Sequence, residues 1–236
     1  MRYFHKQSLL LVLTLFIFGI SGCAGNRPMR MPVATVKGIR GHFFPGQIIA
    51  LPEARAISFE ELVRHLQGKR LVFVGEVHDN AEDHLIEVQI LQALLAHKPR
   101  PDVAMEFFQV EQQQAIDRYF QGKTSETQFL KEAHWRRSWG FPYRFYRPLV
   151  LATKEHDQHL FAINVPRKIV QKVARKGLNG LSPRERNYIA RHIDLTNRKH
   201  RAFLKKVFNQ HAHGNLSNFE YFYQAQCVWE DTMAEH

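Results

Sequence analysis

Three short apolar runs, each followed by a segment of helical character, constrain the fold of this 236-residue chain more than any other feature. The runs are residues 71–74, 102–108 and 159–164, and each has the length and composition of a buried strand. Strands that alternate with helices pair in parallel through right-handed crossovers. The sequence therefore predicts an α/β fold with a parallel sheet of about three to four strands and helices on both faces.

The segments between and after these runs carry helix signals. Ser58 and Glu61 form a capping-box pattern that opens a helix ending near Gly68. Asp79 is the expected cap of a long helix that stops near Pro99. The apolar stripe of that helix is Leu85, Val88, Leu91 and Leu95. Further helices are expected at 111–121, 125–133, 145–157, 167–176, 183–192, 197–210 and 217–235, so the C-terminal half is mostly helical.

The first 23 residues have the organisation of a bacterial export signal. A basic start precedes the apolar run 9–20, which is too short to span a bilayer as a helix. Residues 20–23 (ISGC) resemble the lipobox, in which the cysteine becomes acylated. We therefore expect a lipoprotein signal peptide at 1–22 and lipidation at Cys23, with an ordinary signal peptide or a buried hairpin as the alternatives. Ala24 stands where an aspartate would retain the protein in the inner membrane, which favours an outer-membrane lipoprotein of the bacterial cell envelope.

The rest of the chain divides into a lead-in and one domain. Residues 23–54 are rich in Gly and Pro and predict a tether with one short strand near 47–51. Residues 55–236 form the expected α/β domain. Its last helix ends at His236 without a cap signal, which favours a chain that is shorter than the fold and lacks its C-terminal part. After removal of the signal peptide Cys227 would be the only other thiol, so no intrachain disulfide is expected.

The net charge of +11 points to an acidic ligand or a membrane surface. Nucleic acid is a poor candidate partner, because an exported protein does not meet the genome.

Polar side chains stand at the predicted carboxyl ends of all three strands. Glu76 and His78 follow the first, Glu106 lies on the second, and Asn164 ends the third. Ligands of open parallel sheets bind at this edge. Two carboxylates and an imidazole could hold a divalent metal or act as acid and base. The alternative is that both carboxylates accept hydrogen bonds from helix N-terminal amides and that His78 only packs.

The order of several short motifs resembles the ChaN family of haem-binding uptake lipoproteins in the Tiki superfamily. The motifs are residues 74–79 (VGEVHD), 104–108 (AMEFF), 139–140 (WG), 146–148 (YRP), 163–166 (INVP) and 226–234 (QCVWEDTMA). The resemblance covers roughly 55–236 and implies an α/β fold, a lipid anchor and a role in haem or iron uptake. It also implies haem as ligand, with a homodimer and an outer-membrane haem receptor as further partners.

The same resemblance points to a metal site. Some members of the superfamily are metal-dependent hydrolases with Gly-x-x-His motifs and a glutamate, which correspond here to Gly75, Glu76, His78 and Glu106. Related proteins carry a second such motif beyond the point at which this sequence stops. This difference favours ligand binding over catalysis.

A haem requires an aromatic slot, cations for its propionates and an axial ligand. Residues 134–147 combine aromatic and arginine side chains. The candidates from this segment are Trp139, Tyr143, Arg144, Tyr146 and Arg147. For the axial ligand we expect Tyr143 or Tyr146, followed by Tyr221 or Tyr223. The alternative is that the aromatic residues of this segment only pack in the core.

Three functions thus remain open at this point. The first is a lipid-anchored, non-catalytic haem-binding protein of bacterial haem and iron uptake, which the sequence favours. The second is a metal-dependent, protease-like hydrolase, and the third is a scaffold lipoprotein without catalytic activity.

Overall fold

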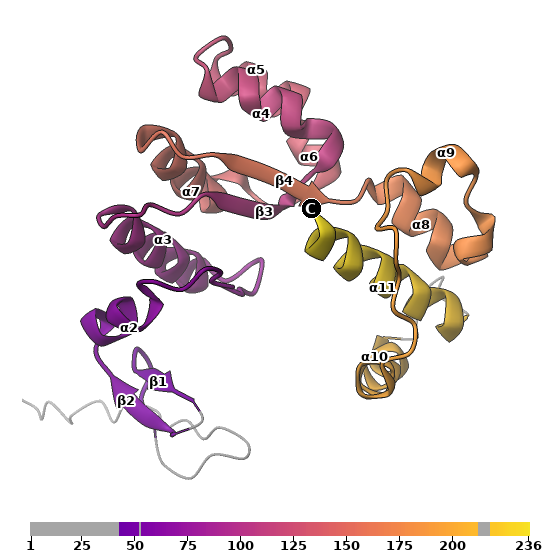
Figure 1. Cartoon of the computed structure of the whole chain (residues 1–236), viewed down its shortest axis with the longest axis horizontal. Coiled ribbons are helices and arrows are strands. Elements are labelled where there is room, and N and C mark those ends of the chain that lie inside the picture. Colours follow the sequence, from indigo (N-terminus) through magenta and orange to yellow (C-terminus); the bar gives the residue numbers. More distant parts are fainter. Residues whose placement is uncertain (1–42, 52, 212–217) are drawn as a thin grey trace, which may run out of the picture. The chain divides into compact units, whose positions relative to one another are not determined.

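The structure is a computed structural model that describes residues 43–51, 53–211 and 218–236 (Figure 1). The chain divides into two compact units, residues 1–65 and 66–236. The expected signal peptide, the lipidation site at Cys23 and most of the tether lie outside the described residues. Among the residues that are described, no helix is both long and apolar enough to cross a bilayer.

The described part of the first unit is a small hairpin and a helix. Strand β1 (Ile48–Ala50) pairs antiparallel with β2 (Arg55–Ile57). Helix α2 (Phe59–Leu66) follows directly, and Ser58 Oγ accepts a hydrogen bond from the Glu61 amide at 3.1 Å. The strand near 47–51 and the helix after Ser58 are therefore where the sequence predicts them.

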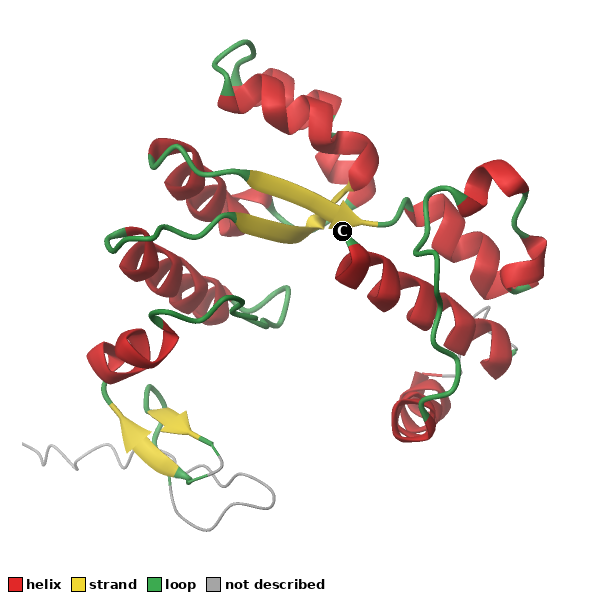
Figure 2. Cartoon of the chain, viewed as in Figure 1, coloured by secondary structure: helices red, strands yellow, loops and turns green. Residues whose placement is uncertain are grey.

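The second unit is built on a parallel pair of strands, β3 (Val103–Gln109) and β4 (Leu160–Asn164) (Figure 2). The outer edge of β4 is covered by one side chain. The Gln113 amide donates to Leu160 O and accepts from Ala162 N, at 2.9 and 2.8 Å. A side-chain amide thus replaces the hydrogen bonds that a further strand would make at this edge.

The predicted strand at 71–74 is wrong: these residues have no regular secondary structure. Leu71 is 69% exposed and Phe73 is 89% exposed, so the run is not buried between neighbours as a parallel strand requires. Within the described residues each sheet has two strands, β1–β2 and β3–β4, so the parallel sheet is smaller than the expected three to four strands. The class is nevertheless α/β, as predicted.

Most helices of the second unit lie where the sequence places them, with ends that differ by a few residues. They are α3 (Ala81–Leu95), α4 (Gln113–Phe120), α5 (Glu126–Glu132), α6 (Trp135–Ser138), α7 (Tyr143–Glu155), α8 (Arg167–Lys176), α9 (Pro183–Arg186), α10 (Arg198–His211) and α11 (Phe219–Glu235), with single 3₁₀ turns at Val110–Gln112 and Leu178–Gly180. The cap of α3 is Asn80 rather than Asp79, since Asn80 Oδ1 accepts from the Glu82 amide at 3.0 Å.

The helix expected at 183–192 stops at Arg186, because side chains of α11 bind the backbone amides that follow. The Ala190 amide donates to Thr232 Oγ1 at 3.1 Å, and the Arg191 amide donates to Glu235 Oε2 at 2.9 Å. A few residues further on, the Asp194 amide donates to Asp231 Oδ2 at 2.7 Å. Tertiary hydrogen bonds therefore replace helical ones in this segment.

Two cores hold the second unit together. The first packs the β3–β4 pair against α3 to α7 and is rich in aromatic residues. Phe107 contacts Trp139 and Tyr146, while Phe108 contacts Phe129 and Trp135. Because successive residues of a strand point to opposite faces, helical side chains cover both faces of β3 here.

The second core joins α8, α11 and the residues that follow α8 through aliphatic contacts, and a smaller cluster joins α10 to α11.

Candidate functional site

The loop that carries Glu76 and His78 is fixed to the start of α3. The Val77 amide donates to Asp83 Oδ2 at 2.9 Å, and the Asn80 amide donates to Val77 O at 2.7 Å. The Asn80 side-chain amide also donates to Asp83 Oδ1 at 2.9 Å. These short-range hydrogen bonds hold the loop although it belongs to neither sheet.

The structure brings together three of the residues that the sequence singles out. Ligand atoms of Glu76, His78 and Glu106 all lie within 4.8 Å of one another. His78 Nδ1 lies 2.5 Å from Glu76 Oε1, and the Glu76 side chain is only 3% exposed. The His78 side chain is 38% exposed, so it is the accessible member of the cluster. The three side chains therefore converge as expected, but not at the ends of three strands, since the segment before Glu76 is no strand and Glu106 lies within β3.

Burial raises the pKa of the Glu106 carboxyl above its ordinary value. The nearby His78 opposes this increase, and the Glu76 carboxylate adds to it. Asn164 lies next to this residue, because its Nδ2 donates to the backbone carbonyl of Glu106 at 2.6 Å. Asn164 Oδ1 is buried and has no hydrogen-bond partner. Asn164 therefore fixes the backbone of Glu106 and leaves one acceptor free.

A second imidazole, which the sequence analysis missed, lies behind the cluster. His84 is buried, with Nδ1 at 3.0 Å from Glu87 Oε2 and Nε2 at 3.2 Å from His78 O. The same Nε2 lies 3.8 Å from Glu76 Oε2, a buried atom without a hydrogen-bond partner. Burial also raises the pKa of Glu87. His84 thus connects a buried carboxylate to the backbone of the loop.

The sequence analysis missed His84 because the apolar stripe that it predicted for α3 does not include this residue. Leu85, which the stripe places inside, is 62% exposed, and the buried face begins instead with His84 and Glu87 before it continues through Leu91 and Leu95. The buried face differs from the predicted stripe because its first turn faces the acidic cluster rather than an apolar core. Two polar residues at helical spacing with Leu91 are the sequence signal that could have revealed this.

Aromatic rings enclose both imidazoles. The His78 ring has centroid distances of 4.8 Å to Trp139 and 5.0 Å to Phe141, both in edge orientation. Trp139 Nε1 is buried and has no hydrogen-bond partner. The His84 ring stacks on Phe145 at 5.0 Å and meets the edge of Tyr146 at 4.7 Å. The aromatic residues of segment 134–147 therefore pack in the core and also contact the two imidazoles. The sequence analysis had given packing and ligand contact as alternatives.

The two tyrosines expected as axial ligands are enclosed. Tyr146 is fully buried, and the hydroxyl groups of both Tyr143 and Tyr146 are buried without a hydrogen-bond partner. Burial, with nearby carboxylates of Glu126 or Glu76, raises the pKa of both phenols far above the ordinary value. Neither phenol is thus placed to ionise easily.

The second pair of tyrosines lies on α11. Tyr223 is fully buried, which raises its pKa to about 12, and the Tyr221 ring lies close to Gly177.

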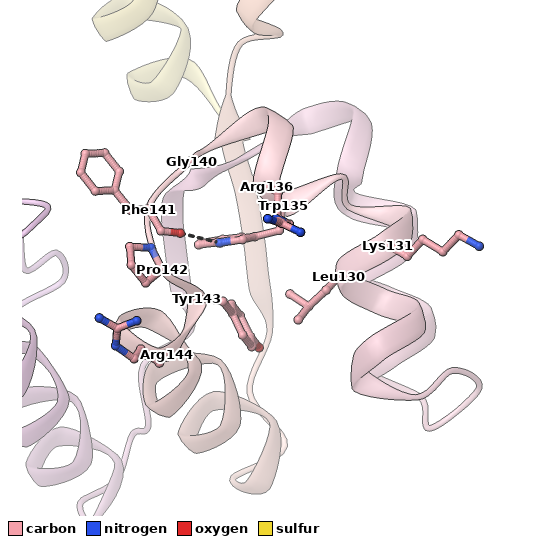
Figure 3. Close-up of a pocket in the computed structure, with 9 residues that line it drawn as sticks. All are labelled: Leu130, Lys131, Trp135, Arg136, Gly140, Phe141, Pro142, Tyr143 and Arg144. Carbon is pink, nitrogen blue, oxygen red and sulfur yellow. Dashed lines mark hydrogen bonds between the residues drawn. The ribbon is translucent and has the colours of Figure 1, made fainter.

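An open pocket of about 830 Å³ lies beside Phe141, on segment 130–144 (Figure 3). Its volume lies within the usual range of small-molecule sites. Trp135 Nε1 donates to Phe141 O at 2.8 Å and closes one wall, and the Tyr143 ring points into the space between α7 and α5. The lining cations are Lys131, Arg136 and Arg144, none of which forms an ion pair with a described residue.

The arginines that the sequence proposed for the propionates differ in their partners. Arg144 lies over the Phe145 ring at 4.7 Å and remains without a carboxylate partner among the described residues. Arg147 binds Glu126 through two hydrogen bonds, of 2.8 and 3.0 Å. Arg136, from the same segment, lines the pocket and forms no ion pair with a described residue.

Comparison with known proteins gives a consistent result. The family described as "Haem-binding uptake, Tiki superfamily, ChaN" matches residues 62–236. A solved structure titled "Cofacial heme binding to ChaN of Campylobacter jejuni" superposes with a TM-score of 0.61 and 19% identity, over 78% of this chain and 71% of that one. At this identity the match supports the fold alone.

Among curated proteins, "Protein RETICULATA-RELATED 5, chloroplastic" of Arabidopsis thaliana is 24% identical over 159 residues. The matched region is 64% of this chain and 21% of that protein, so the chain spans about a fifth of its length.

Proposed function

Because the chain belongs to the ChaN family of haem-binding uptake proteins in the Tiki superfamily, we propose that it binds haem with His78 as the axial ligand. The supporting observation is the setting of the His78 side chain. It is the partly exposed imidazole of the acidic cluster, and its Nδ1 lies 2.5 Å from the buried Glu76 carboxylate. A carboxylate at one ring nitrogen fixes the tautomer, so that Nε2 presents its lone pair to a metal.

The surrounding residues fit the rest of a haem. Trp139 and Phe141 flank His78 and provide aromatic contact for a porphyrin. Lys131, Arg136 and Arg144 line the pocket beside Phe141, whose lining includes neither His78 nor Trp139; they have no ion-pair partners among the described residues and suit carboxylates. When bound, haem supplies an iron that an imidazole can ligate and two propionates that these cations neutralise.

A titration of ferric haem followed by absorbance tests the axial ligand. Wild-type protein shifts the Soret band, and His78→Ala weakens haem binding by roughly tenfold or more, since the axial bond is lost. The matched control is His97→Ala, which removes an exposed imidazole that follows α3. Undiminished binding by His78→Ala together with loss of binding by Tyr143→Phe would overturn the assignment in favour of the tyrosine.

The cations are tested with two ligands. Arg136→Ala with Arg144→Ala weakens the binding of haem by roughly fivefold to tenfold, because each arginine contributes a charge-assisted hydrogen bond. The dimethyl ester of haem lacks both carboxylates, so the double variant and the wild-type protein bind the ester equally. Equal weakening with both ligands would show that the variant damages the pocket rather than the propionate contacts.

A divalent metal is the second candidate ligand, because Glu76, His78 and Glu106 converge within 4.8 Å. Carboxylate and imidazole groups suit such ions, and a metal held there would support a hydrolase rather than a carrier. Glu106→Gln separates the two functions. It removes a metal ligand and lowers zinc affinity measured by calorimetry, while the Soret shift with haem is retained.

The cellular role that we propose is haem and iron uptake from the bacterial outer membrane. Support comes from the family and from the sequence of residues 1–23, whose lipobox would place an acyl anchor at Cys23. Incorporation of labelled palmitate into the wild-type protein but not into Cys23→Ser tests the anchor. Growth on haem as the only iron source tests the role, and we expect it to require both Cys23 and His78.

A homodimer and an outer-membrane receptor remain proposed partners. Sedimentation with and without haem tests the homodimer.

A further inference from the structure

Helix α10 carries an unusual distribution of charge. Its residues Arg198–His211 include five Lys or Arg residues and no Asp or Glu. One face of the helix packs on α11, where Leu204 is buried against Tyr223 and Cys227. On the same side, Arg201 forms an ion pair with Glu220. These contacts orient α10, and two of its five cations take part in them, Arg201 with Glu220 and Lys205 with the Phe219 ring.

The opposite face has no such partners. Arg198, Lys199 and Lys206 are exposed and form no ion pair with a described residue, whereas the ammonium of Lys205 lies over the Phe219 ring of α11 at 4.3 Å. Phe203 stands among them and is 62% exposed. Lys199 and Lys206 are four residues before and three residues after Phe203, so all three side chains share one helical face. This basic face, with one aromatic residue, has no acidic side chain of its own helix.

We propose that the outer face of α10 docks on an anionic lipid surface, with Phe203 at the headgroup level. Basic amphipathic helices bind such surfaces through electrostatic attraction to the headgroups and burial of their apolar side chains. The long lysine side chains reach phosphate groups while their methylene stems cover the apolar boundary. A protein partner fits less well, because lysine is depleted in protein–protein interfaces and a single aromatic residue makes a small apolar core.

Flotation of the full chain with vesicles tests the proposal. Neutral phosphatidylcholine vesicles measure every contribution that does not depend on headgroup charge, including that of the N-terminal segment. Vesicles that also contain phosphatidylglycerol measure the electrostatic increment. For the wild-type protein we expect this increment to be large and to fall with ionic strength, because salt screens charges at a surface.

The variant Lys199→Glu with Lys206→Glu lowers the electrostatic increment by roughly tenfold or more. Its control is Arg175→Glu with Lys176→Glu at the end of α8, which changes the net charge equally and replaces two exposed cations without ion pairs among the described residues. A third variant, Phe203→Ser, weakens binding to the anionic vesicles by a few-fold without changing its dependence on salt. Circular dichroism verifies that each variant is folded.

The proposal fails if the two charge-reversal variants lose the increment equally, since binding would then reflect net charge alone. It also fails if wild-type protein floats equally with neutral and anionic vesicles, in which case the face is free for another occupant such as an acidic protein.

Discussion

The aromatic part of the second unit (residues 66–164) and its C-terminal part (residues 165–236) differ in how many buried polar side-chain atoms lack a hydrogen-bond partner. In the aromatic part, the buried polar side-chain atoms without hydrogen-bond partners are Glu76 Oε2, Arg118 Nε, Thr124 Oγ1, Trp139 Nε1, Tyr143 Oη, Tyr146 Oη and Asn164 Oδ1. Among residues 165–211 and 218–236, Trp229 Nε1 is the one such atom found. There, Thr232, Asp231 and Glu235 of α11 accept hydrogen bonds from backbone amides of the preceding segment.

The two parts therefore differ in how completely their buried polar groups are hydrogen-bonded. A buried polar atom without a partner costs free energy, so most folded structures pair such atoms. Two of these atoms, Glu76 Oε2 and Trp139 Nε1, belong to side chains that contact His78, the proposed axial ligand. The C-terminal helices complete their hydrogen bonds internally and are suited to stabilise the fold.

The largest expected effect is the difference in stability loss between removing a fully buried imidazole, His84, and a partly buried one, His200. His84→Ala leaves the Glu87 carboxyl buried without its partner and lowers the free energy of unfolding by about 3 kcal/mol. In the C-terminal helices, His200 Nε2 lies 3.1 Å from Oε2 of the half-exposed Glu230. The His200→Ala substitution therefore lowers the free energy of unfolding by less than about 1 kcal/mol. Urea denaturation monitored by circular dichroism measures both. Equal losses would contradict the view that the buried network supports the site.

A smaller effect is expected where α11 binds the segment after α9. Thr232 is fully buried, and Thr232→Val removes the acceptor of the Ala190 amide while it preserves the shape of the side chain. The unpaired amide lowers the free energy of unfolding by about 1–3 kcal/mol. Thermal denaturation measures the loss, and a change of less than this range would show that water replaces the hydroxyl.

The raised pKa of Glu106 predicts how stability depends on pH. The folded state binds this proton more tightly than the unfolded state, so stability falls as the pH rises from the ordinary pKa of 4.5 through the raised value. Below this window both states are protonated and Glu106→Gln has little effect. Above it the variant is more stable than wild-type protein. A series of urea titrations between acidic and neutral pH tests the difference, and a variant that is less stable at neutral pH would contradict it.

The smallest expected effect is that of Tyr146→Phe. The substitution removes a buried hydroxyl whose nearest polar neighbour is the Trp139 side chain, and it preserves the ring contacts with Phe107, Trp135 and Trp139. The free energy of unfolding therefore stays within about 0.5 kcal/mol of wild type or increases. A loss comparable to that of Thr232→Val would show that the hydroxyl is paired in the apo protein.

Local patterns predicted most of the elements of this fold. β3 and β4 were evident as apolar runs, and α8 was predicted with its observed ends. The predictions failed where distant residues compete for the backbone. In the helix expected at 183–192, backbone amides near its end donate to side chains of α11 instead of to helical carbonyls. The run at 71–74 has no neighbouring strand among the described residues with which to pair.

The sequence also predicted only part of the site, because some of its contacts depend on tertiary packing. Glu76, His78 and Glu106 come together as expected, because their backbone positions follow from the order of loop, helix and strand. His84 was not found, since its role depends on which face of α3 meets the acidic cluster. The ion pair of Arg147 with Glu126 joins two helices, and no local spacing could indicate it.

By itself the sequence determined the α/β class, the helical C-terminal half, the cationic character and the family. These properties depend on residue type and on spacing along the chain, which are local quantities. Only the tertiary structure decided which imidazole is accessible, which tyrosines are enclosed and which arginines remain unpaired. Accessibility and pairing are determined by side chains that lie far apart in the sequence, and these meet only when the chain is folded.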